Sequence, residues 1–137
     1  MRNTYYEIYV HIVWGAKNKE QMINSSVEKI IYPIIDTKVE SHKASIIAKG
    51  NTMDHIHLLL SVSPETNIPL LIKEIKGATS YFINHKTKEN LYWQDGYGIL
   101  SVSKSGISRV KKYVESQKEH HSLEGEIISI LERHCVV

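Results

Sequence analysis

Two histidines, His55 and His57, stand two residues apart at the start of an apolar run that extends to Val62. The run predicts a β-strand, and side chains at positions i and i+2 of a strand point to the same face. Both imidazoles can therefore reach one metal ion. The opposite face of the predicted strand is uniformly apolar and predicts the side that packs on the core: Ile56, Leu58, Leu60 and Val62.

Tyr113 and Gln117 form a second pair, four residues apart in a helix predicted from about residue 108 to 121. Helical positions i and i+4 share a face, so Gln117 can add an amide oxygen beside the two imidazoles. We expect Tyr113 to lie among polar groups, outside the apolar stripe of this helix. A phenol is a poor nucleophile unless its phenolate is stabilised, for example by a divalent ion. Together the two pairs predict a metal-assisted phosphoryl-transfer site.

Each of these residues also has an ordinary structural interpretation. Histidine pairs occur on solvated strand faces, and most helical tyrosines are packing residues. His11 and His120 are candidates for groups that hydrogen-bond the ligands, and a purely structural role for His11 is an equal alternative. The ion is also open, since imidazoles favour zinc and other transition ions whereas amide and phosphate oxygens favour Mg²⁺ or Mn²⁺.

The elements that must position these residues follow from periodicity and turn signals. Capping-box spacing of Ser25 and Glu28 predicts a helix start, Pro33 should bend or split that helix, and Lys49–Asn51 predicts a turn. The predicted order is strand (Tyr5–Trp14), helix (Ser25–Ser41), strand (Ala44–Ala48), strand (Met53–Val62), helix (Asn67–His85), strand (Gly96–Val102), helix (108–121) and a short tail helix (123–137). This order favours an α+β, ferredoxin-like (split βαβ) antiparallel sheet, with helices on one face and the tyrosine-bearing helix near the C-terminus.

Length and composition restrict the number of domains, the cellular compartment and the kind of partner. A chain of 137 residues is typical of one domain, here 1–137 with a core of about 4–121 and a tail of 122–137. The single cysteine excludes an intramolecular disulfide and fits a reducing cytoplasm, and no apolar run approaches a membrane span. Residues 73–119 hold nine Lys and Arg against five Asp and Glu, an excess that suits nucleic acid. The candidate DNA contacts are Arg109, Lys111, Lys112, Lys104, Lys17 and Lys19.

Three segments resemble a known family. Asp54-His55-Ile56-His57 resembles the HUH motif (histidine, hydrophobic residue, histidine), and residues 113–121 resemble the tyrosine helix of single-tyrosine HUH transposases. Residues 93–98, with Ser101-Val102-Ser103, are similar to a segment that precedes that helix. From about Tyr5 to His121, the chain resembles the TnpA-like transposases of the smallest bacterial insertion sequences and their palindrome-associated relatives.

The resemblance implies a mechanism. Tyr113 would attack a phosphate of single-stranded DNA, leaving a 5′-phosphotyrosine link and a free 3′-hydroxyl, while His55, His57 and Gln117 would hold Mg²⁺ or Mn²⁺. It also implies a homodimer that recognises hairpins at the ends of the element; no membrane partner is expected, because the chain has no long apolar run. The chain departs from the family pattern at two places. Ser116 stands where relatives often have Asn, and residues 17–20 are less basic than in many relatives, which concerns the grip on DNA at that connection.

Two other functions stay open. One is a related HUH nicking enzyme with a host role at repeated palindromes or a role on a plasmid. The other is a non-catalytic single-stranded nucleic-acid-binding module of ferredoxin-like fold, which would stack bases on Tyr5 and Tyr9. The second interpretation leaves the histidine pair unexplained.

Overall fold

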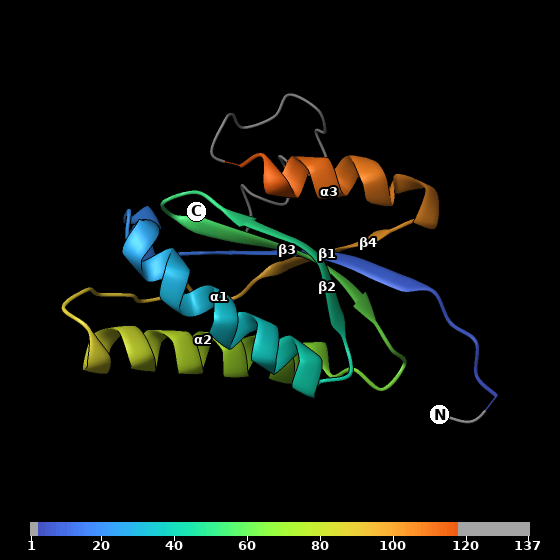
Figure 1. Ribbon diagram of the computed structural model, residues 1–137, viewed down its shortest axis with the longest axis horizontal. Coiled ribbons are helices and arrows are strands. Elements are labelled where there is room, and N and C mark those ends of the chain that lie inside the picture. Colours follow the sequence, from blue (N-terminus) through green and yellow to red (C-terminus); the bar gives the residue numbers. More distant parts are fainter. Residues whose placement is uncertain (1–2, 118–137) are drawn as a thin grey trace.

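The computed structural model describes residues 3–117, which form an α+β fold. Its antiparallel sheet has the strand order β2-β3-β1-β4. Helices α1 and α2 cover one face, and α3 lies on the other (Figure 1). This confirms the predicted ferredoxin-like architecture. The bounds are β1 (Ile8–Gly15), η1 (Lys17–Lys19), α1 (Ser25–Ser41), β2 (Ser45–Asn51), β3 (His55–Val62), α2 (Ile68–Lys86), β4 (Gly98–Val102), η2 (Lys104–Gly106) and α3 (Ile107–Glu115).

The main core lies between the sheet and the helices α1 and α2. Alternate residues of β1 and β3 enter it, as the strand pattern predicts, and they are buried together with the apolar stripes of both helices. The strand residues in this cluster are Val10, Ile12, Trp14, Ile56, Leu58, Leu60 and Val62. Because successive side chains alternate between faces, this packing turns His55 and His57 toward α3.

Helix α1 has the predicted bounds, but its N-cap differs from the prediction. Oδ1 of Asn24 accepts a hydrogen bond of 2.9 Å from the backbone N–H of Val27, so Asn24 is the cap and the predicted capping box is wrong. The helix also runs through Pro33 without being split. A proline inside a helix costs about 3 kcal/mol, whereas each buried aliphatic side chain of the α1 stripe contributes roughly 1.5–3 kcal/mol, and α1 buries four of them.

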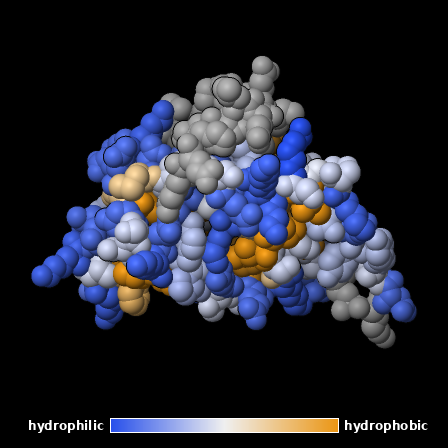
Figure 2. All heavy atoms as spheres, turned by 45° about the horizontal axis from the view of Figure 1, so that its top comes forward, coloured by the Kyte–Doolittle hydropathy of each residue, from blue (hydrophilic) through white to orange (hydrophobic). Residues whose placement is uncertain are grey.

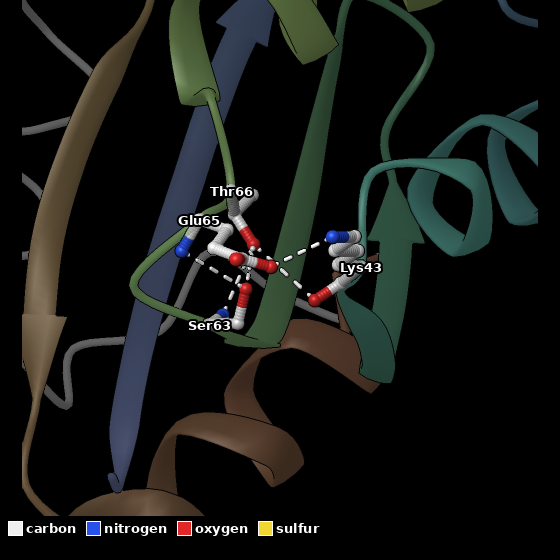
Figure 3. Close-up of polar contacts among 4 residues, drawn as sticks. All are labelled: Lys43, Ser63, Glu65 and Thr66. Atoms are coloured by element: carbon white, nitrogen blue, oxygen red, sulfur yellow. Dashed lines mark hydrogen bonds and ion pairs between the residues drawn. The ribbon is translucent and has the colours of Figure 1, made fainter. Parts of the chain in front are cut away.

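The connection from β3 to α2 is tied to the turn that precedes β2 (Figure 3). Lys43 Nζ lies 2.7 Å from Glu65 Oε1, and the Thr66 hydroxyl donates to the Lys43 carbonyl oxygen at 3.2 Å. The same hydroxyl accepts a 3.0 Å hydrogen bond from the backbone N–H of Ser63. These contacts fasten β2 and β3 at the end of the sheet opposite His55. Asn67 then caps α2, since its side chain accepts from the N–H of Leu70 at 3.1 Å.

Strand β2 continues to Asn51, so the turn predicted at Lys49–Asn51 is wrong. Gly50 pairs with His57 in the sheet, and a Cβ atom at Gly50 would overlap the backbone carbonyl oxygen of Val114 in α3. The glycine therefore serves a close approach between helix and strand, a use of glycine that resembles a turn signal in sequence.

The ends of several elements also differ from the predictions. Strand β1 starts at Ile8 instead of Tyr5, because Ile8 pairs with Val62, the last residue of β3. Strand β3 starts at His55 and β4 at Gly98, two residues later than predicted in each case. Helix α3 ends at Glu115, with Ser116 as its C-cap, so the prediction that it continues through residues 116 and 117 is wrong. Residues 118–121 of the predicted helix, which include His120, and the tail helix (123–137) lie outside the described residues. Between residues 3 and 117, no helix is long and apolar enough to cross a membrane.

Candidate active site

Helix α3 packs over β2 and β3 through a small second core. Tyr113 is buried there with only 4% of its surface exposed, together with Val110 and Val114 and the strand residues Ala48 and Leu59. The prediction that Tyr113 lies outside the apolar stripe is therefore wrong. The buried face of this segment includes polar residues as well as aliphatic ones. Residues 110, 113, 114 and 117 have the spacing i, i+3, i+4 and i+7, and all four are turned toward the sheet.

The four residues predicted to do chemistry converge between α3 and the sheet. The ring centroids of His55 and His57 lie 5.0 Å apart, and the Tyr113 ring lies 5.6 Å from that of His57 in an edge-to-face arrangement. Gln117 follows the end of α3 and is 3% exposed. Its Cγ would be 3.6 Å from a Cβ at Gly50, the strand partner of His57. Gln117 is thus just past the helix, not within it, and its side chain lies next to the strand partner of His57.

Neighbouring polar groups orient both imidazoles. Nδ1 of His55 lies 2.6 Å from Oδ1 of Asp54 and 2.9 Å from the hydroxyl of Thr52. Nδ1 of His57 lies 2.8 Å from Nε2 of His11. A metal-binding histidine ordinarily uses its second ring nitrogen for such a hydrogen bond, which fixes the tautomer and the ring orientation. These bonds are therefore compatible with metal ligation through Nε2 of both residues.

The donor set can be tested against a divalent ion. The side-chain amide N–H of Gln117 donates to the Tyr113 carbonyl oxygen at 2.9 Å, while its Oε1 is buried and accepts no hydrogen bond within the described part of the chain. A buried oxygen left in this state costs roughly 1–3 kcal/mol, and a cation would remove that cost. Among residues 3–117 no cluster of three or more His, Cys, Asp and Glu forms a metal site. The donors that could hold a divalent ion here are two imidazoles and one amide oxygen.

Sequence reasoning missed three residues that shape this site. Thr52 and Asp54 hold His55, and Gly50 lets α3 approach the sheet. Asp54 directly precedes His55, which was a usable signal because adjacent carboxylates commonly orient histidine ligands. Gly50 carried no such signal, since the atom that excludes a side chain there belongs to Val114, 64 positions away in the sequence.

The predicted DNA contacts are exposed and fall into groups at different places. Arg109, Lys111 and Lys112 are exposed on α3. Figure 2 shows hydrophilic residues over much of the described surface on one side of the molecule, interrupted by hydrophobic patches. Nζ of Lys104 lies 2.7 Å from Oε2 of Glu7, which lowers its availability for a phosphate. A further pair, Lys17 and Lys19, follows the end of β1.

This last pair lies at the end of the sheet where the histidines begin. Gly15 is the strand partner of His55, and the backbone N–H of Ala16 donates to the Asp54 carbonyl oxygen at 2.7 Å. Lys17 therefore stands two positions beyond the strand partner of a predicted ligand.

Comparisons with known proteins agree with this geometry. The chain is 30% identical over 125 residues to the ISDra2 transposase TnpA of Deinococcus radiodurans, covering 86% of this chain and 89% of the relative. It is 23% identical over 137 residues to the transposase for insertion sequence element IS200 of Salmonella typhimurium, covering 95% and 89% of the two chains.

Two solved structures share the fold, each with a TM-score of 0.65. One is a putative transposase from Deinococcus radiodurans, which is 25% identical and matches 86% of this chain and 96% of its own. The other is a REP-associated tyrosine transposase bound to a REP hairpin, 14% identical, with coverages of 83% and 68%. The family model described as "Transposase IS200 like" matches residues 4–117. The chain therefore belongs to the family of IS200-like transposases, which are DNA-cleaving enzymes.

Proposed function

We propose that this transposase cleaves and rejoins single-stranded DNA, with Tyr113 as the nucleophile and a divalent ion, Mg²⁺ or Mn²⁺, held by His55, His57 and Gln117. The observation that carries the proposal is the convergence of these side chains, with the Tyr113 ring 5.6 Å from that of His57 and the Gln117 oxygen buried nearby. A buried tyrosine that packed for stability alone would not require two imidazoles and an unsatisfied amide oxygen beside it.

The reaction exchanges one phosphodiester for another. The Tyr113 oxygen attacks the phosphorus, its bond to phosphorus forms, and the bond from phosphorus to the 3′ oxygen breaks. The tyrosine proton leaves, the departing 3′ oxygen gains a proton, and the 5′ end stays on Tyr113. Attack by a 3′-hydroxyl reverses these changes and rejoins the DNA without a nucleotide cofactor. When bound, the ion supplies positive charge that offsets the charge developing on the phosphate.

The residues around the site have separate tasks in this scheme. Asp54 and Thr52 orient His55, and His11 orients His57, so that both rings present the same nitrogen. Tyr113 is 4% exposed, so the groups that cover it must move before a DNA phosphate can enter. Arg109, exposed one turn before Tyr113 on α3, is suited to contact the phosphate backbone.

The DNA and the assembly are part of the proposal. One relative was solved with a REP hairpin, and we extend hairpin-bearing single-stranded DNA to this chain as its substrate. A homodimer is expected from the family resemblance. Light scattering coupled to size-exclusion chromatography tests it, since a mass near twice 15.7 kDa is expected and a monomeric mass in the presence of DNA would contradict it.

A host role at repeated palindromes is the second candidate, favoured by the structural likeness to the REP-associated protein. Copies of the gene flanked by subterminal hairpins would support a mobile element, whereas a single copy among dispersed palindromes would support the host role. The non-catalytic alternative would use Tyr5, which is 82% exposed, and would leave the buried histidines unused.

Covalent trapping of DNA tests the cleavage activity. Single-stranded DNA from the ends of the element, labelled at its 3′ end, is incubated with the protein and Mn²⁺ and resolved on a denaturing gel. The label should move with the protein, because the fragment that runs from the 5′ phosphate to the labelled 3′ end stays attached to Tyr113. Chelation should abolish the adduct. Binding without any adduct at every divalent ion tested would favour the non-catalytic module.

A further inference from the structure

A pocket of about 370 Å³ lies apart from the candidate active site, on the side of the sheet that carries α2. Helix α2 contributes one wall through residues 76, 77 and 80, and segment 92–96 with Lys17 forms the other. A Cβ atom at Gly77 would meet nothing within 4 Å, so the pocket is open above the helix at this position. Its volume falls in the range of small-molecule sites.

Hydrogen bonds hold the second wall in place. The backbone N–H of Lys17 donates to the Tyr92 carbonyl oxygen at 2.8 Å, and that of Gln94 donates to the Gly15 carbonyl oxygen at 2.8 Å. Lys76 Nζ donates to the carbonyl oxygens of Gln94 and Gly96 at 2.9 and 2.6 Å. The pocket is therefore built before any ligand arrives, which lowers the entropic cost of binding.

The lining side chains indicate the chemistry of the ligand. Tyr92 keeps 53% of its surface exposed although it is a large aromatic residue, and exposed aromatic rings stack well on unpaired bases. Lys17 is exposed and makes no ion pair with any described residue, so its charge is available to a phosphate. Asp95 would repel a phosphate but can accept hydrogen bonds from the N–H groups of a base.

The place of the pocket links it to the proposed reaction. Lys17 and Tyr92 extend the end of the sheet where Gly15 pairs with His55. A DNA strand that left the active site around this end of the sheet would therefore reach Lys17 and Tyr92, which line the pocket. Other exposed aromatics, such as Tyr81 on α2, do not line it.

We infer that this pocket binds one unpaired nucleotide of the DNA strand close to the cleaved phosphate, with its base stacked on Tyr92 and its phosphate against Lys17. Asp95 orients the base by accepting from its N–H groups. The inference rests on the proposed function, because it needs single-stranded DNA as the substrate.

Photocrosslinking locates the nucleotide. Tyr113→Phe protein, which should bind without cleaving, is irradiated with single-stranded hairpin oligonucleotides that carry 5-iodouracil at one position at a time. We expect a crosslink in the peptide that contains Tyr92, from one position or two adjacent positions near the cleavage site. Crosslinks spread over many positions, or none in residues 92–96, would overturn the assignment.

Binding measurements with matched variants separate the pocket from the chemistry. Tyr92→Ala should weaken oligonucleotide binding by about 5- to 100-fold, the usual effect of losing one stacked base, while Tyr92→Phe and Tyr81→Ala should bind as the wild type does. Lys17→Ala should lower the salt slope of binding by about one ion, and Lys88→Ala should leave it unchanged. Equal binding by Tyr92→Ala and the wild type would overturn the inference.

The two proposals fail in different ways. If the wild type forms a metal-dependent adduct and Tyr92→Ala forms it equally well at both low and saturating DNA, only the pocket is wrong. If no protein forms an adduct, the cleavage mechanism is wrong, whatever the crosslinks show. The pocket assignment is supported when Tyr92→Ala loses adduct at low DNA and regains it at saturating DNA.

Discussion

Nε2 of His11 lies 2.8 Å from Nδ1 of His57, and both rings are almost completely buried. The register of β1 on β3 explains the contact, because His11 pairs with Leu59 and so lies diagonal to His57. If His57 binds a cation through Nε2, its Nδ1 carries the proton and donates to His11. We therefore propose that His11 positions His57, which lies on the neighbouring strand.

Replacing His11 tests this role. His11→Leu removes the ring nitrogen that faces His57 Nδ1, so we expect the rate of adduct formation to fall by about 10- to 100-fold, as for other partners of metal ligands. The Mn²⁺ concentration for half-maximal rate should rise as well. His11→Gln restores an acceptor and should recover part of both effects. A uniform rate loss in both variants with no change in metal dependence would indicate a structural role only.

Gln117 is expected to contribute directly to metal affinity. Gln117→Ala removes the buried amide oxygen and should weaken Mn²⁺ binding, measured by calorimetry in the absence of DNA. Gln117→Glu offers a carboxylate, which divalent ions prefer, and should bind at least as tightly as the wild type. The neighbouring Ser116→Ala is a control, since the Ser116 hydroxyl donates to the Lys112 carbonyl oxygen instead of facing the site. Unchanged Mn²⁺ binding in Gln117→Ala would remove Gln117 from the ligand set.

Gly50 should be required for catalysis although it has no side chain. A methyl group there would overlap the carbonyl oxygen of Val114, so Gly50→Ala should push α3 from the sheet and cost about 1–3 kcal/mol of unfolding free energy. The rate of adduct formation should fall by more than the loss of folded protein explains, because Tyr113 and Gln117 move with α3. Full activity in Gly50→Ala would show that α3 does not need this close approach.

A second glycine provides the stability control. Gly77 lies in α2 with open space at its Cβ, so Gly77→Ala should raise the free energy of unfolding by up to about 1 kcal/mol. Denaturant unfolding of both variants checks the pair. A loss of stability in Gly77→Ala would mean that crowding is not what separates the two positions.

The sheet and its functional face were predictable because they depend on alternation. Ile56, Leu58 and Leu60 alternate with His55 and His57, and the burial of one set decides the orientation of the other. The order of the helices and strands along the chain also allowed the sheet topology to be predicted, because few topologies accommodate two split βαβ units.

What could not be predicted depends on partners remote in sequence. Tyr113 is polar at its tip but packs with Val110 and Val114, and only the docking of α3 on Leu59 reveals this. Asn24 and Ser25 are both good caps, and the choice between them rests on one hydrogen bond. The sequence around Gly50 is typical of a turn, because composition does not distinguish a glycine in a turn from a glycine that packs under a helix.

The most direct test of the account is the identity of the residue that becomes joined to DNA. The trapped adduct is digested with nuclease and protease, and the modified peptide is sequenced by tandem mass spectrometry. The account predicts a nucleotide linked through its 5′ phosphate to Tyr113, with a free 3′-hydroxyl on the released strand and no adduct in Tyr113→Phe. A nucleotide on another residue, or an undiminished adduct in Tyr113→Phe, would contradict it.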